Sequence, residues 1–318
     1  MIQSALVAAS LALLNGFSGA NPVSTRATAV SDTSADFSWT GSVPNGGWLR
    51  IRNLAGSVVV RRATGNAVEI SARPEPVSDR WLLWDNRRIE PVRFVTRRQG
   101  SDVVVCAISD DMPRCDPSDL SQNNDSNNDW RPQAMRIIVQ LPAGVAIQAG
   151  TMHGDLEIAG TSSDVVARSG HGGISIRNVT GLITASSGHG DVDITGAAAR
   201  VTASTGHGNV HVSSAGAVRA TTGHGDITVE LASAAATGAN DMTFETGHGN
   251  VRVVAPKTLT GDVDMHTGHG RVSSDFPLSS TDPDRDTKGG SVHGILGSGG
   301  RLVRLSSGHG DVTLTTAD

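Results

Sequence analysis

The chain of 318 residues has few aromatic side chains, with five Trp, five Phe and no Tyr. Only Phe244 and Phe276 lie after residue 130, so the longer part of the chain cannot build a thick core around large rings. The 38 glycines of the whole chain do not recur at every third position, and proline contributes only 12 residues. This composition excludes a collagen-like helix. Valine, isoleucine and leucine recur throughout and the formal net charge is only −5, which excludes a disordered chain.

Long apolar runs are also missing. The run Ala5–Leu14 is too short to span a bilayer. Together with the small residues Ser18 and Ala20, it predicts a secretory signal peptide over residues 1–20. Residues 1–4 contain no Lys or Arg, so an N-terminal strand or a buried segment is the alternative. We expect an exported mature chain without a transmembrane span, located in the periplasm, on the outer surface or outside the cell.

Cysteine is nearly absent. Cys106 and Cys115 are the only two, with eight residues between them. In an oxidising compartment two such thiols are expected to form a disulfide that closes a short loop. A free thiol pair or half of a metal site are the alternatives, but a zinc site needs a second pair of ligands.

The dominant pattern is a repeat built on the dipeptide His–Gly. Four of the nine copies read [ST]-G-H-G-[DN]-[VI]-x-[VI], as in S-G-H-G-D-V-D-I around His189, and the others depart from it at one or more positions. Successive copies are 16 to 24 residues apart, most often 18. The longer spacings carry insertions near 232–240 and 282–290, and the last but one copy is degenerate. The nine histidines are His153, His171, His189, His207, His224, His248, His269, His293 and His309.

Within one unit apolar and polar residues alternate, as they do in a strand with one buried face. Val201, Ala203, Val210 and Val212 face one way, on either side of the glycine turn. One unit cannot bury this face alone, but stacked units pair strand on strand about 4.8 Å apart around a narrow core. The sequence therefore predicts an all-β protein, a β-solenoid (parallel β-helix-like) of roughly 18-residue coils.

The turn residues have separate expected roles. Glycine supplies the positive φ that a reversal needs, and it lets neighbouring coils approach closely. The Asp or Asn after the second glycine is expected to bond amides of its own turn. This position is occupied by Asp155, Asp191, Asn209, Asp226, Asn250 and Asp311.

The first 135 residues do not contain the His–Gly repeat. Residues 21–40 resemble a polar lead-in, and residues 41–135 a β segment that contains the disulfide loop. Because a solenoid end exposes unpaired strand edges, we expect this segment to cap the solenoid or to form its first irregular coils. Residues 136–318 are then the His–Gly repeat solenoid.

Charge is segregated in the front segment. Residues 50–98 hold eleven Arg, and residues 101–130 hold seven Asp. We expect the two stretches to neutralise one another, and a mildly acidic exported chain is a poor candidate for nucleic-acid binding. Residues 116–129 are typical of a loop and lack the D-x-D-x-D-G spacing of a calcium loop.

From about residue 45 to residue 318 the chain resembles the bacterial putative-adhesin family of unknown function, exported proteins built on G-D-[IV]-x-[IV] repeats. The resemblance rests on Leu49–Val60, on the strand Ile137–Val145 and on the repeats from Gly154 to Val312. It implies the solenoid fold and an envelope location, and it carries over no catalytic residue. The histidine in nearly every turn departs from the family pattern, in which this position varies.

Stacked coils would align the turn imidazoles about 5 Å apart, and two interpretations remain open. Each ring can bond a neighbouring coil or stack on the next ring, or adjacent rings can bind zinc, copper or nickel. Either way we expect the column to be sensitive to acid, because neighbouring imidazolium charges repel. The candidate metal ligands are His171, His189, His207, His224, His248, His269 and His309.

No catalytic motif of a hydrolase, kinase or metalloprotease is present. The acid pairs Asp191 with Asp193 and Asp262 with Asp264 are the only hints of a carbohydrate-active β-helix. We therefore expect a non-enzymatic, adhesin-like envelope scaffold without a cofactor, which presents a repetitive polar surface to a glycan or protein ligand. An envelope protein that binds zinc, copper or nickel through the stacked histidine column is the second hypothesis, and a carbohydrate-active β-helix is the third.

Overall fold

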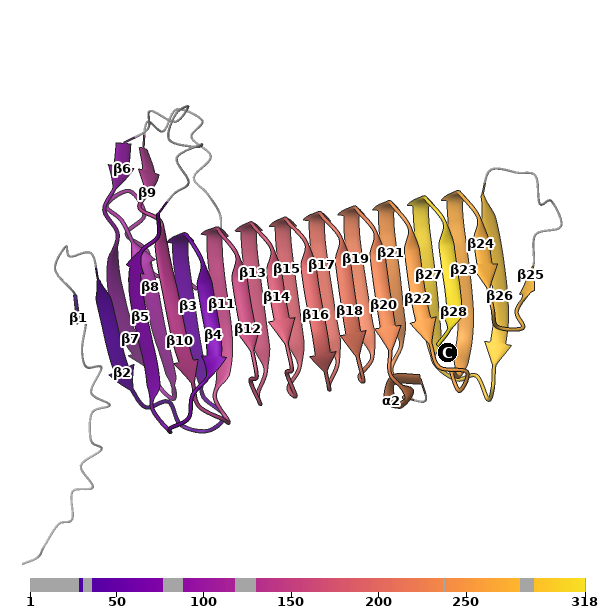
Figure 1. Cartoon of the computed structure of the whole chain (residues 1–318), viewed down its shortest axis with the longest axis horizontal. Coiled ribbons are helices and arrows are strands. Elements are labelled where there is room, and N and C mark those ends of the chain that lie inside the picture. Colours follow the sequence, from indigo (N-terminus) through magenta and orange to yellow (C-terminus); the bar gives the residue numbers. More distant parts are fainter. Residues whose placement is uncertain are drawn as a thin grey trace, which may run out of the picture.

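Two long β-sheets run side by side along an elongated rod (Figure 1). The computed structural model describes residues 29–30, 36–76, 88–117, 130–236, 238–280 and 289–317. One sheet has 14 strands and the other has 12; we call them the first and the second sheet. Each coil contributes one strand to each sheet, which confirms the predicted all-β solenoid.

Six consecutive coils form the middle of the rod. Each first-sheet strand ends at a turn histidine, and parallel neighbours pair in the register of the repeat, with His189 opposite His207. The first-sheet strands are β11 (Ala146–His153), β13 (Val165–His171), β15 (Ile183–His189), β17 (Val201–His207), β19 (Val218–His224) and β21 (Met242–His248). Their second-sheet partners are β12 (Leu156–Ala159), β14 (Ile174–Arg177), β16 (Val192–Ala197), β18 (Val210–Ser214), β20 (Ile227–Leu231) and β22 (Val251–Ala255).

The core lies between the two sheets and is lined by small side chains. Val201, Ala203, Val210 and Val212, predicted to share a face, are at most 1% exposed. The outward residues between them remain partly exposed. Because each strand has one apolar face, the coils are stable only as a stack.

The corner opposite the turn histidines varies in length. The predicted insertion near 232–240 contains α2 (Ser233–Ala236), whose Ala235 and Ala236 are buried. Most of the other predicted insertion, near 282–290, lies outside the described residues.

The solenoid starts well before residue 136. β3 (Trp48–Ala55) pairs in parallel with β11, and β4 (Val58–Arg62) pairs in parallel with β12. Ala55 lies opposite His153 in this register, so Ala55–Gly56 stands where later coils have His–Gly. The boundary drawn at residue 136 falls inside the solenoid, because the first coil keeps the alternation but lacks the histidine.

Beyond the first coil, β10 (Met135–Leu141) pairs in parallel with β4, and β8 (Asp102–Ile108) pairs in parallel with β3. Antiparallel strands then close this end of the rod: β5 (Val68–Pro74) and β2 (Phe37–Gly41) extend the second sheet, and β7 (Arg93–Gln99) and β1 (Ala29–Val30) extend the first. β6 (Arg88–Glu90) and β9 (Trp130–Pro132) form a separate pair. β1 and β2 come from the range 21–40 expected to be a lead-in. The predicted signal peptide and most of the loop 116–129 lie outside the described residues.

Two kinds of contact stabilise this end. The predicted disulfide between Cys106 and Cys115 is present. Arg50 pairs with Asp102 at 3.0 Å, which is one of the expected contacts between the arginine and aspartate stretches. Burial of Asp102 favours its neutral form, but hydrogen bonds from the Trp48 amide, Arg50 and Ser101, together with the charge of Arg50, hold its pKa below the ordinary value.

The coils at the other end are not stacked in chain order. β27 (Leu302–His309) lies between β21 and β23 (Gly261–His269), and β28 (Val312–Thr316) lies between β22 and β24 (Val272–Ser274). β26 (Gly290–Leu296) pairs antiparallel with β23 and with β25 (Ser279–Ser280). The degenerate copy at His293 does not form a coil of the stack, because β26 runs antiparallel to the solenoid strand β23.

Candidate functional site

The candidate site is the corner at which the chain passes from the first to the second sheet. The glycine after each stacked histidine has a φ between 139° and 156°, which L-residues rarely adopt. A Cβ at Gly208 would lie 2.4 Å from the carbonyl oxygen of Gly190 in the preceding coil. The glycine therefore allows both the turn and the close stacking of turns.

A buried hydroxyl bonds each turn to its neighbour. The Ser or Thr two residues before the histidine donates a hydrogen bond to the glycine carbonyl of the adjacent coil, as from Thr205 to Gly190 at 2.9 Å. These side chains are at most 6% exposed. This role is not evident from the sequence of a single unit, although the position is always Ser or Thr. The set is Thr151, Ser169, Ser187, Thr205, Thr222, Thr246, Thr267 and Ser307.

A second ladder follows the second glycine. The side chain of Asp191 accepts a hydrogen bond from the amide of Asn209 at 2.7 Å, and Asn209 accepts one from the amide of Asp226 at 2.9 Å. The prediction that these residues bond amides of their own turn is wrong, because the acceptor oxygen reaches the next coil. Gly173 and Arg271 can occupy the position because each contributes only its backbone amide to the ladder. The amide of Gly173 donates a hydrogen bond to the side chain of Asp155, and the amide of Arg271 donates one to the side chain of Asp311.

Eight imidazole rings form one exposed column along this corner. Neighbouring ring centroids lie 4.5 to 4.9 Å apart, with interplanar angles of 0° to 9°. All seven predicted candidates lie in the column, and His153 extends it. The order is His153, His171, His189, His207, His224, His248, His309 and His269.

The other histidines lie elsewhere. His293 is in antiparallel β26. His211 projects from the second sheet and its Nδ1 lies 3.1 Å from Asp193. His266 lies in β23 and is exposed.

Comparison with known families identifies this repeat. Residues 129–315 match the family Toastrack DUF4097, which is more than half of the chain. The chain belongs to the Toastrack DUF4097 family. This membership confirms the resemblance inferred from the repeats. No curated protein matches the chain.

Two solved structures resemble this Toastrack chain. A putative cell adhesion protein from Clostridium sporogenes ATCC 15579 has 11% identity and a TM-score of 0.23, with 89% of this chain and 100% of that chain covered. A putative adhesin from Bacteroides fragilis NCTC 9343 has 12% identity and a TM-score of 0.34, with 89% and 97% covered.

In the Toastrack column the rings are not arranged around a shared ion. Two bonds of about 2.1 Å from zinc to nitrogen can span at most about 4.2 Å, less than the 4.5 to 4.9 Å between ring centroids. The ring planes are parallel, so the lone pairs of corresponding nitrogens do not converge. Among the described residues no three His, Cys, Asp or Glu side chains are grouped to hold a metal. Metal binding by neighbouring rings therefore requires the rings to rotate.

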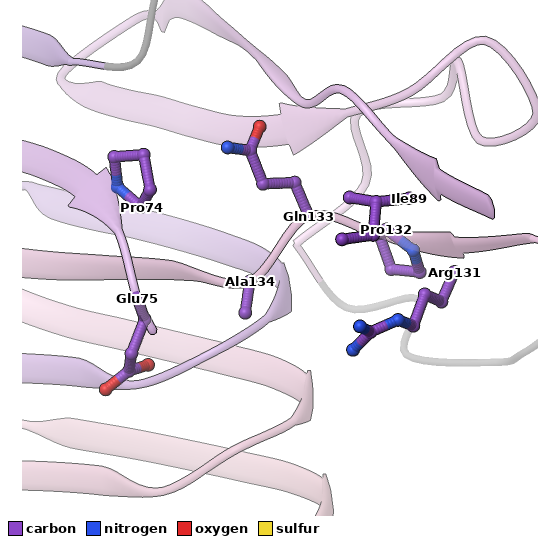
Figure 2. Close-up of a pocket in the computed structure, with 7 residues that line it drawn as sticks. All are labelled: Pro74, Glu75, Ile89, Arg131, Pro132, Gln133 and Ala134. Atoms are coloured by element: carbon purple, nitrogen blue, oxygen red, sulfur yellow. The ribbon is translucent and has the colours of Figure 1, made fainter. Parts of the chain in front are cut away.

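A small cavity of about 200 Å³ lies beside the cap of the Toastrack solenoid (Figure 2). Pro74 at the end of β5 and the next residue, Glu75, line one side, and Ile89 and residues 131–134 line the other. The carboxylate of Glu75 accepts hydrogen bonds from the amide and hydroxyl of Ser57. Ser57 thus holds the one carboxylate in the cavity's described lining.

The outer face of the first sheet presents rows of hydroxyl groups. Ser186, Ser204 and Thr221 are consecutive in one row, and Thr184 and Thr202 are neighbours in the next. Arg168 continues the first row on one side and Glu245 on the other. Strand pairing fixes the repeat of these rows at about 4.8 Å.

Proposed function

We propose that this Toastrack chain is a non-enzymatic, exported scaffold whose first sheet binds a repetitive polar ligand of the cell envelope, a glycan. The observation that carries the proposal is the row of outward hydroxyls repeated in register along the rod. A flat array with a fixed repeat is suited to a polymer whose own groups repeat. Arg168 and Glu245 at the ends add charged hydrogen-bonding groups.

The acidic residues support a binding role over hydrolysis. Asp191 accepts a hydrogen bond from the amide of Asn209, and Asp193 pairs with His211 at 3.1 Å. Asp264 pairs with Arg304 at 3.1 Å. Three of the four acids in the candidate pairs therefore make structural contacts.

Two features support export. A disulfide persists in oxidising compartments and is rare in the cytosol. The sequence of residues 1–20 has the apolar run and small residues of a signal peptide. Among the described residues no helix is long and apolar enough to cross a membrane.

Glycan binding can be tested with the full chain on a glycan array and with purified peptidoglycan. The variant Ser186→Ala/Ser204→Ala/Thr221→Val removes three hydroxyls of the first sheet and keeps its β-propensity. We expect the affinity for the bound glycan to fall at least tenfold. The control variant Thr195→Val/Ser213→Ala/Thr228→Val removes three outward hydroxyls from the second sheet and should bind like the parent. An absence of glycan binding by the parent chain, or an equal loss in both variants, would contradict the proposal.

Metal capture by the imidazole column is the second candidate. The observation that favours it is the alignment of eight exposed rings in one line, since neutral imidazole is a common ligand of zinc and copper. Isothermal titration with Zn²⁺ and Cu²⁺ should then give a binding isotherm in the micromolar range. The variant His189→Asn/His207→Asn should bind fewer ions. A parent chain that releases no heat below millimolar metal would rule this candidate out.

A further inference from the structure

The last coil of the chain, formed by β27 and β28, occupies a position that the chain order does not predict. Its inner neighbour is the coil of β21 and β22, and its outer neighbour is the coil of β23 and β24. Figure 1 shows the yellow strands of the last coil between two orange coils. Both neighbours precede the last coil in the sequence. We call the space between these two neighbours, which the last coil fills, the slot.

The contacts in the slot are those of an ordinary coil. His309 stacks between His248 at 4.7 Å and His269 at 4.5 Å. Ser307 donates a hydrogen bond to Gly249, and Thr267 donates one to Gly310. The register, the ring stacking and the hydroxyl bonds thus repeat what every other coil offers.

The outer neighbour carries the same set of groups as the last coil. Both have His–Gly at the turn and a hydroxyl two residues before the histidine, and Val263 and Met265 occupy the core positions of Val303 and Leu305. If the last coil leaves, the outer neighbour can therefore dock directly on the inner one. Its departure then costs one coil interface in total, although the coil has a neighbour on each side.

The connection into the slot is short and rich in glycine. Gly297, Gly299 and Gly300 have φ values of 60°, 67° and 110°, and they allow the segment after β26 to change direction. Next to them, Arg301 is 3% exposed. Its guanidinium donates hydrogen bonds to the carbonyl oxygens of Ala235 at 2.6 Å, Ala236 at 2.5 Å and Thr260 at 3.0 Å. Arg301 therefore anchors the last coil through contacts that the repeat itself does not provide.

We propose that the last coil is exchangeable, so that residues 302–316 of one chain insert into the slot of a second copy and join two solenoids. The occupant is a second copy because the slot fits a coil of this repeat and offers little else. A released last coil has both strand edges unpaired, and the slot of another copy satisfies them in the same register. This proposal does not depend on the proposed glycan binding.

The exchange can be measured with two full-length variants, each with one new cysteine. Glu245 in β21 and Ser306 in β27 are directly paired, and neighbouring strands place Cα atoms within disulfide range. Mixing Glu245→Cys with Ser306→Cys under mild oxidation should give a disulfide-linked heterodimer on a non-reducing gel. Mixing Ser186→Cys with Ser204→Cys, a pair on consecutive central coils, should give none.

Two further variants test the role of the anchor. Arg301→Ala in both partners should raise the rate of heterodimer formation several-fold, because the last coil loses its additional contacts. A chain with both Glu245→Cys and Ser306→Cys should close within itself and stay monomeric. If that double variant closes but the mixed single variants form no more heterodimer than the central pair, with or without Arg301→Ala, the proposal is overturned.

Discussion

At the scale of single residues, the buried hydroxyl before each turn does more than fill space. Every stacked turn exposes a glycine carbonyl to the adjacent coil, and a Ser or Thr hydroxyl bonds it. An acceptor left without a partner in the interior costs about 1–3 kcal/mol. The alternation of the strand explains why this residue points inward, and the polar partner explains why it is not Val.

We expect Thr205→Val to lower the free energy of unfolding by about 1–3 kcal/mol, because the shape is kept while the donor to Gly190 is lost. Thr202 lies on the same strand with its side chain outward, so Thr202→Val should change stability by less than about 0.5 kcal/mol. Thr205→Ser keeps the donor and should recover most of the loss. Urea unfolding followed by circular dichroism measures all three, and an equal effect of Thr205→Val and Thr202→Val would disprove the role.

At the scale of the coil, the sequence is sufficient to predict the fold. The alternation around Val201 and Val210 predicts two strands with one buried face, and the His–Gly spacing predicts the register that places His189 opposite His207. Seven of the eight column rings follow from that register. The ladder of Asp191 and Asn209 could not be assigned from one unit, because its partner amide belongs to the next coil.

Coil order is harder to predict for a physical reason. All coils present the same hydrogen-bonding groups. The repeat alone therefore does not determine whether β23 or β27 pairs with β21. Only local features decide: Arg301 bonds three carbonyls outside the repeat, and the His293 copy has no second-sheet strand of its own, because β26 is followed directly by β27. The first coil was missed for the opposite reason, because Ala55 stands in place of the histidine while the strand pattern is kept.

At the scale of the whole molecule, the imidazole column runs along most of the solenoid. Protonation of two neighbouring rings places like charges about 5 Å apart, which costs roughly 1–3 kcal/mol at effective dielectric constants of 80 to 20. The charged groups at the same corner are Asp155, Asp191, Asp226 and Asp311, which attract the imidazolium ions, and Arg271, which repels them. With at most four carboxylates for eight rings, repulsion between the rings is only partly offset.

Acid should therefore destabilise the folded rod. In the unfolded chain the same histidines are separated by many residues, so imidazolium charges are held about 5 Å apart only in the folded rod. We expect a lower melting temperature at pH 5 than at pH 7 in far-UV circular dichroism. The variant His189→Asn/His207→Asn/His224→Asn interrupts the column with neutral side chains and should lose less on acidification. The role of ring repulsion would be refuted by a melting temperature that is the same at both pH values, or by a variant that loses as much as the parent chain.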